Sequence, residues 1–192
     1  VFIDASKIIT KQTTWEERYK ALKLGEEKLN NNNIGKYSAD EDARFGCKGK
    51  NKYWFGYKRH EAVDMSSGLK IDVFATPANI SDTQGVKYIC PNDAMIFADK
   101  GYCIGEAQEI FREKNCHSGA IKKNNMHEKN KDKDRWISGV RAPFEGVFSE
   151  INNRARYRGL EKVKFQIILD AIIFNIKRLV AIESVPLFDY GI

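Results

Sequence analysis

The chain has 192 residues, of which 42% are hydrophobic and 30% charged, and it contains 11 Phe, 8 Tyr and 3 Trp. That apolar content excludes a disordered polypeptide and is enough for one domain with its own core. The net charge of +6 indicates an acidic partner, but charge alone does not distinguish a nucleic acid from an anionic surface. The four cysteines form no CxxC pair, which favours free thiols in a reducing compartment over a zinc site.

No segment has the pattern of a signal peptide or a membrane span. The most apolar stretch, 165–176, is short and contains Asp170, so we expect a core helix there. We therefore predict a cytoplasmic protein without a membrane partner. The sequence begins with Val in a predicted strand, from which we expect that an N-terminal portion is missing.

The first half of the chain predicts a strand, a charged insertion and a hairpin of two strands. The expected elements are a strand over 1–9, a charged helix over 15–29, a polar loop over 30–33, a strand over 53–64, a turn at 66–68 and a strand over 69–75. Between 43 and 60, six Lys and Arg alternate with aromatic residues and no acid is present.

The second half predicts alternating helices and strands. Ser81 and Gln84 have the spacing of a capping box, which predicts a helix towards Tyr88. The further elements expected are a strand over 94–98, a helix over 106–114, a strand over 117–121, an exposed loop over 122–135, a helix starting near Pro143 and a helix over 161–182. This order predicts an α/β fold with a mixed sheet and helices packed against it.

The helix after Pro143 contains a candidate functional acid. Apolar residues recur with a helical period from about 137 to 151, and Glu145 lies about 100° from Phe144, at the edge of that stripe. Arg141 lies on the same flank, whereas the other acid, Glu150, lies on the opposite flank. Taken alone, Glu145 is more often a solvated residue of an amphipathic helix.

Two aspartates are candidate partners for Glu145. Asp99 directly follows the apolar run AMIFA, and groups just beyond the carboxyl ends of strands line functional crevices in α/β sheets. Asp4 lies inside an apolar strand, where a carboxylate is costly to bury unless it is paired or binds a metal. The alternatives are a turn-forming Asp99 and an edge-strand Asp4 that faces water. Together, three carboxylates suit two Mg²⁺ or Mn²⁺ ions.

Several ordered motifs extend over nearly the whole chain. They are FIDASKI around Asp4, DARFGCKGKNKYWFGYKRHEAVDMSSG from Asp42, TPANISD from Thr76, FADKGY around Asp99, RAPFEGVF around Glu145 and RARYRGL from Arg154. In these motifs and in their order the chain resembles the DDE transposases of bacterial insertion sequences, of the IS-four/IS-five superfamily.

The resemblance implies an RNase H-like fold with Asp4, Asp99 and Glu145 as the catalytic, metal-binding triad. Asp4 would lie on the first strand, Asp99 at the end of the fourth and Glu145 on a following helix. It implies two Mg²⁺ or Mn²⁺ ions, and cleavage and strand transfer of double-stranded DNA at element ends and target. We expect the catalytic domain over 1–184, with an insertion at about 10–50, and a tail over 185–192.

The sequence departs from the family around Glu145. Many relatives show the pattern Y-x2-R-x3-E-x6-K, but Ser138 stands at the Tyr position and Asn152 at the Lys position. A catalytically inactive DNA-binding remnant of a transposase is therefore an alternative. An RNase H-like nuclease is another, because it shares the fold and the metals but not the motifs.

Lys and Arg are the expected contacts to DNA phosphates. The candidate residues are Arg141, Arg154, Arg156, Arg158, Lys162, Lys58 and Arg59. Trp54 and Tyr57 could stack on bases, although core packing is favoured for both, and His60 is favoured as a structural residue. The stripe of apolar residues between Phe165 and Val180 is predicted to be core, and a dimer role is less favoured for it. The resemblance implies a bacterial, nucleoid-associated protein, and a homodimer on DNA is left open.

Overall fold

The fold was analysed in a computed structural model. It describes residues 1–11, 23, 29–49, 52–123, 126, 129–149 and 153–183. The helix expected over 15–29 lies almost wholly outside these residues. Glu150, Asn152 and the expected tail also lie outside them.

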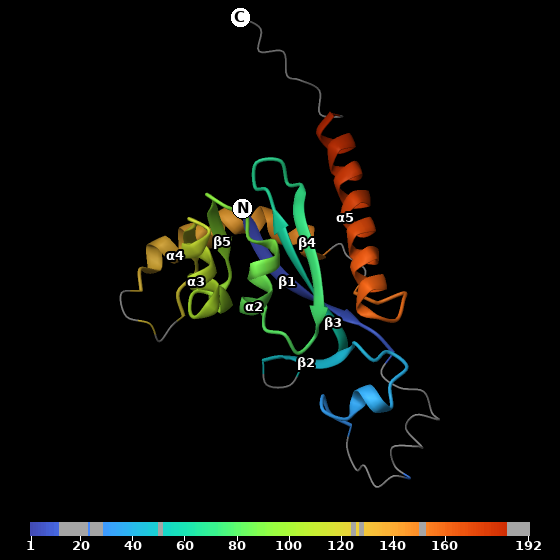
Figure 1. Ribbon diagram of the computed structural model, residues 1–192. Coiled ribbons are helices and arrows are strands. Elements are labelled where there is room, and N and C mark those ends of the chain that lie inside the picture. The colour runs from blue at the N-terminus through green and yellow to red at the C-terminus, as the bar shows by residue number, and fades with distance from the viewer. Residues whose placement is uncertain are drawn as a thin grey trace, which may run out of the picture.

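The six strands of the described residues form one mixed sheet (Figure 1). They are β1 (Phe2–Ile9), β2 (Arg44–Lys48), β3 (Lys52–Val63), β4 (Lys70–Pro77), β5 (Met95–Ala98) and β6 (His117–Ala120). The order is β2-β3-β1-β5-β6, and β4 pairs with β3. β1, β2 and β4 run antiparallel to β3, whereas β5 is parallel to both β1 and β6.

Four α-helices are described, with two short 3-10 turns. The helices are α2 (Asp82–Ile89), α3 (Glu106–Glu113), α4 (Lys131–Ser149) and α5 (Leu160–Glu183), and the turns are Ile34–Lys36 and Lys100–Tyr102. Alternation along β1 sends Ile3 into the core beneath α2 and α3, and Ile8 into a second core beneath α5. A mixed sheet covered by helices is the RNase H-like α/β fold that the sequence predicts.

Local signals explain why several elements are where the sequence predicts them. The Ser81 hydroxyl accepts from the Gln84 N–H and the Gln84 side chain accepts from the Ser81 N–H, so the capping box that opens α2 is confirmed. The apolar run before Asp99 forms β5, in which Ile96 and Ala98 are fully buried. Among the described residues, no helix combines the length and the apolar character that a bilayer span requires.

Two predictions about the elements are wrong: one strand was not expected, and one helix begins earlier than expected. Arg44–Lys48 forms a strand, β2, against β3 inside the predicted insertion, so Asp99 follows the fifth strand of the chain and not the fourth. α4 begins at Lys131 and not near Pro143, because the Asn130 side chain accepts from the N–H groups of Asp132 and Lys133. Residues 131–135, expected in a loop, form its first turn.

The stripe on α5 was predicted as core and is exposed. Its members have exposed fractions of 40% to 58%, whereas α5 packs through Val163, Gln166, Ile167 and Ala171. The helix is apolar on both sides, so its period alone could not show which side faces the sheet.

Candidate active site

The parallel pairing of β1 with β5 brings Asp4 and Asp99 to the same level of the sheet. Phe2 pairs with Phe97, and each aspartate lies two residues further along its strand direction. β5 ends at Ala98, while β1 continues to Ile9. Beyond Phe2, no described strand pairs with this edge of β1 until the isolated bridge of Ile9 with Arg154, so the sheet is open there.

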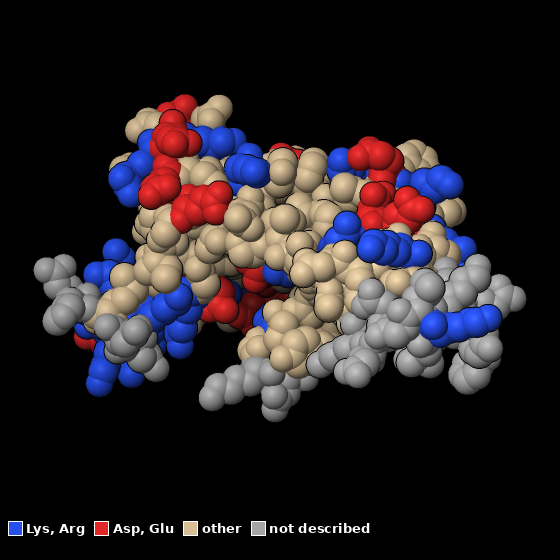
Figure 2. Space-filling view, turned by 60° about the horizontal axis from the view of Figure 1, so that its bottom comes forward, with Lys and Arg blue, Asp and Glu red and all other residues tan. Residues whose placement is uncertain are grey.

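A cleft with a volume of about 580 Å³ lies at this open edge. Figure 2 shows a hollow on this face, with acidic side chains in its depth and Lys and Arg gathered beside it. The charged residues that line the cleft are Asp4, Asp82, Asp99, Glu145, Lys7, Lys48, Lys52, Lys58 and Arg141. The three acids predicted from the sequence therefore share one cleft.

Arg141 lies between two of these acids. Its guanidinium nitrogens are 3.8 Å from Asp99 Oδ1 and 3.9 Å from Glu145 Oε1. The Arg141 side chain is only 8% exposed, and its guanidinium carbon lies 4.8 Å from the centre of the Phe2 ring. Glu145 is one turn further along α4, so the helix itself sets the spacing of this pair.

The three carboxylates differ in their surroundings. Asp4 accepts a hydrogen bond from the Ala5 N–H at 2.8 Å, and burial raises the pKa of Asp4 to about 6, against the opposing effect of that bond and of Lys48. Asp99 accepts from the Lys100 N–H at 2.7 Å. The side chains of Asp99 and Glu145 are 59% and 66% exposed, so both have room to change rotamer.

Asp82 is a fourth acid of the cleft, and the sequence analysis missed it. It is the first residue of α2 and accepts from Lys58 Nζ at 2.8 Å. The signal was present in the motif TPANISD, where Asp82 directly follows the capping Ser81. Acids are common in the first turn of a helix, because they interact favourably with its dipole. The sequence position of Asp82 therefore does not by itself indicate a place in the cleft.

The donor chemistry of the cleft suits a hard divalent cation, since its acids supply only oxygen ligands. In the described residues, however, no three His, Cys, Asp or Glu side chains are close enough to hold a metal ion as they stand. Asp99 and Glu145 both face the Arg141 guanidinium. Joint binding of a metal by these acids would therefore require side chains of the cleft to change rotamer, for which the exposed Asp99 and Glu145 have room.

Arg59 is predicted as a DNA contact, and the structure contradicts this prediction. Its side chain is 1% exposed and donates to Asp170 Oδ2 of α5 at 2.6 Å, so it cannot reach a phosphate. The neighbouring Glu61 is equally buried and is paired with Lys70 at 2.8 Å. Lys58 does line the cleft, but it is already bound to Asp82.

The segment that joins α4 to α5 presents three arginines that are exposed, Arg154, Arg156 and Arg158. The buried Gln166 side chain accepts from the Arg156 N–H and donates to the Arg154 carbonyl. Asp42 accepts from the Leu160 N–H at 2.8 Å. These bonds fix the arginine segment beside the end of β1, where Asn153 reaches the cleft.

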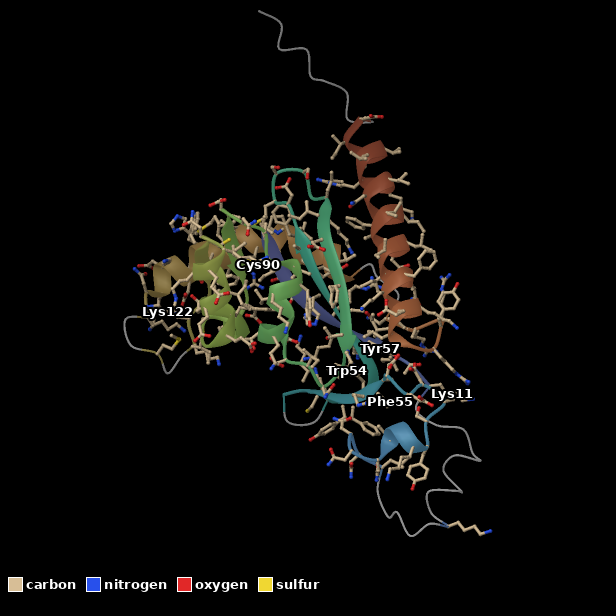
Figure 3. All side chains as sticks on the ribbon, in the orientation of Figure 1. Lys11, Trp54, Phe55, Tyr57, Cys90 and Lys122 are labelled. Atoms are coloured by element: carbon tan, nitrogen blue, oxygen red, sulfur yellow. The ribbon has the colours of Figure 1, made fainter. Side chains whose placement is uncertain are left out.

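The aromatic residues of β3 have different environments (Figure 3). Tyr57 is fully buried and donates to Asp40, and Trp54 donates to the Tyr57 carbonyl at 3.1 Å. Core packing, the favoured prediction, is confirmed for Tyr57. Tyr53, which the sequence analysis did not single out, is 71% exposed and lines the cleft beside Trp54.

Comparisons with known proteins agree with these features. The model of the family described as "Transposase DDE domain" matches residues 1–176. A protein of Neisseria meningitidis serogroup B, described as the transposase for insertion sequence element IS1106, is 29% identical over 161 residues. The match covers 78% of this chain and 55% of the relative, so the chain spans about half of the relative's length. No solved structure gives a significant match.

Proposed function

Because the chain belongs to the transposase DDE domain family of insertion sequences, we propose that it is the part of a transposase that cleaves the DNA of an insertion element and joins it to a target. The observation that carries this proposal is the shared cleft of Asp4, Asp99 and Glu145. Three acids that are distant from one another in the sequence line this cleft, beside several lysines. The substrate would be double-stranded DNA, which would locate the protein with the bacterial nucleoid.

In this proposal, Asp4, Asp99 and Glu145 are the catalytic carboxylates and the ligands of two Mg²⁺ or Mn²⁺ ions. Bound ions would activate the attacking water or 3′-hydroxyl and stabilise the leaving oxygen. The backbone N–H groups of Ala5 and Lys100 orient one oxygen of Asp4 and one of Asp99.

Arg141 acts on the carboxylates and not on DNA in this proposal. In the metal-free protein its buried guanidinium lies 3.8 Å from Asp99 and 3.9 Å from Glu145, and it keeps both side chains on one side of the cleft until an ion binds. A fixed cation here also offsets the repulsion between the acids before a metal is bound. Arg141 was predicted as a DNA contact, but its 8% exposure supports a positioning role.

Phosphates of the DNA would be bound on two sides of the acids. Lys7, Lys48 and Lys52 line the cleft itself. Arg154, Arg156, Arg158 and Lys162 are exposed on the segment that follows α4 and on the start of α5. Contacts of this kind supply affinity and depend on salt, but they do not select a base sequence.

A DNA-binding remnant without catalytic activity is the second candidate. Two observations favour it: Ser138 replaces the family's tyrosine, and its hydroxyl donates within the helix to the Asp134 carbonyl. In addition, no three acids of the described residues are arranged as a ready metal site. Such a remnant would bind DNA and would not cleave it in any divalent metal.

Cleavage of a duplex that carries the element end separates these candidates. We expect the protein to nick or cut this DNA in Mg²⁺ or Mn²⁺, and Asp99→Asn to reduce cleavage by at least about a thousandfold with DNA binding retained. Asp132→Asn is the matched control, because Asp132 is 94% exposed and lies outside the cleft. Equal cleavage by Asp99→Asn would reject the proposed triad, and faster cutting of an RNA–DNA hybrid would favour a nuclease.

A further inference from the structure

The outer side of α5 is an apolar surface that no other described element covers. Figure 1 shows the helix at the margin of the molecule, alongside β4. Its apolar face consists of eight large residues with exposed fractions between 40% and 58%. They are Phe165, Ile168, Leu169, Ile172, Ile173, Ile176, Leu179 and Val180. At about 100° per residue, all eight lie within about 140° of the helix circumference.

The area of this face is that of a large apolar patch on a soluble protein, and patches of this size often have a function. Eight side chains that are about half exposed present on the order of 500 Å² of apolar surface. Two copies of the face, pressed together, would remove on the order of 1,000 Å² from water before flanking polar groups are counted. That area reaches the range of specific protein interfaces.

The sequence of α5 is complementary to itself when one copy is reversed. A two-fold interface requires that residues at equal distances on either side of its axis match one another. With the axis between Ile172 and Ile173, four pairs meet this requirement. They are Phe165 with Val180, Leu169 with Ile176, Ile172 with Ile173, and Lys162 with Glu183, whereas Ile168 and Leu179 at the edges of the face fall opposite Lys177 and Gln166.

We propose that the apolar face of α5 is the interface of a homodimer, in which the α5 helices of two copies pack antiparallel about an axis at Ile172 and Ile173. The apolar pairs form the centre of this interface. At each end, exposed Lys162 of one copy lies opposite Glu183 of the other, so charges of opposite sign close both ends. The interface uses no residue of the cleft. It shares Lys162 with the proposed phosphate contacts, so its test is made without DNA.

The test is the mass of the protein in solution without DNA, measured by sedimentation equilibrium over a range of concentrations. We expect a dimer, and Ile172→Lys should raise its dissociation constant by about tenfold or more, because two like charges then meet at the axis. Ile104→Lys is the control, since Ile104 is 42% exposed and lies outside α5. It should leave the dimer intact. A monomeric wild-type chain, or equal weakening by both variants, would overturn the proposal.

Charge exchange tests the antiparallel arrangement itself. Lys162→Glu should weaken the dimer, because it places like charges opposite each other at both ends. Adding Glu183→Lys should restore the wild-type dissociation constant. In a parallel pair each residue would meet its own copy, so the double variant would give no recovery, and that result would reject the antiparallel interface. Circular dichroism of each variant verifies that α5 remains helical.

Discussion

His60 of β3 and Gly85 of α2 lie in close contact. A Cβ atom at Gly85 would lie 2.1 Å from the His60 ring, and the ring is held by Thr76 Oγ1 at 2.9 Å. His60 is fully buried, so movement of the ring away from a new Cβ would break its bond to Thr76 or displace neighbouring core residues. α2 can therefore approach the sheet this closely only with glycine at position 85.

Gly85→Ala should destabilise the protein by about 2 kcal/mol, since overpacking costs more than the gain in helix propensity returns. Urea denaturation gives the free energy of unfolding directly. Gly139→Ala is a matched control on α4, where a Cβ would meet nothing within 4 Å. It should stabilise the protein by up to about 1 kcal/mol. A stabilising Gly85→Ala would contradict the packing described.

His60 should also make folding sensitive to acid. Burial lowers the pKa of His60 from 6.5 to about 4 in the folded protein, an effect that nearby Asp82 partly opposes. Between pH 4 and 6.5 the unfolded chain therefore binds more protons than the folded one, and stability falls as the pH is lowered through this range. The full difference amounts to about 3 kcal/mol.

Denaturant unfolding at a series of pH values measures this effect. His60→Gln removes the titrating group, so the variant should lose less stability than the wild type between pH 6.5 and 4, whatever its stability at neutral pH. Parallel curves for the two proteins over that range would show that the His60 ring is not held neutral by burial.

At the scale of elements, α4 positions both Arg141 and Glu145, and its first turn depends on a cap. Asn130 accepts from the N–H groups of Asp132 and Lys133 at 3.0 and 2.9 Å. From this start the helix continues through Pro143, and its residues Ile137 and Arg141 are buried against the rest of the molecule. Phe148 then contacts the Phe2 ring, with 4.9 Å between the ring centres.

Asn130→Ala should cost about 1 kcal/mol, because two helical N–H groups lose their acceptor. Asn130→Asp keeps an acceptor oxygen at the same place and should retain most of the stability. Thermal unfolding of the three proteins provides the comparison. If alanine and aspartate behave alike, the cap does not determine where α4 begins.

The elements differ in how far their sequences specify them. The Ser81–Gln84 spacing and the apolar run before Asp99 are local signals, and α2 and β5 occur where these signals predict them. The apolar side of α5 could not be assigned, because the choice depends on Gln166 and Asp170 bonding to distant segments. The burial of Arg59 has no local signal, because its partner Asp170 is 111 residues away in the sequence.

At the scale of the whole molecule, the fold brings acids that are distant in the sequence to one cleft. Three acids predicted from sequence motifs do line one cleft, because the parallel register of β1 and β5 aligns Asp4 with Asp99. Their detailed arrangement was not predictable. The family pattern gives residue types, whereas the distances of Asp99 and Glu145 to Arg141 depend on rotamers and burial.

The arginine segment after α4 should account for part of the affinity for DNA. Replacing Arg156 and Arg158 with alanine should weaken binding and reduce the slope of log affinity against log salt by roughly two. Fluorescence anisotropy at several salt concentrations measures both quantities. Lys87→Ala with Arg112→Ala removes the same charge from exposed sites outside the cleft. Equal losses in the two double variants would mean that net charge, and not this segment, governs binding.

The central claim is that Asp4, Asp99 and Glu145 act as one metal-binding group. Calorimetric titration of the protein with Mn²⁺ at pH 8, well above the pKa of about 6 at Asp4, tests it most directly. We predict saturable binding that is lost in Asp99→Asn and in Asp4→Asn and is retained in Asp132→Asn. Mn²⁺ binding that is absent from the wild type, or that is unchanged by Asp99→Asn, would contradict the account.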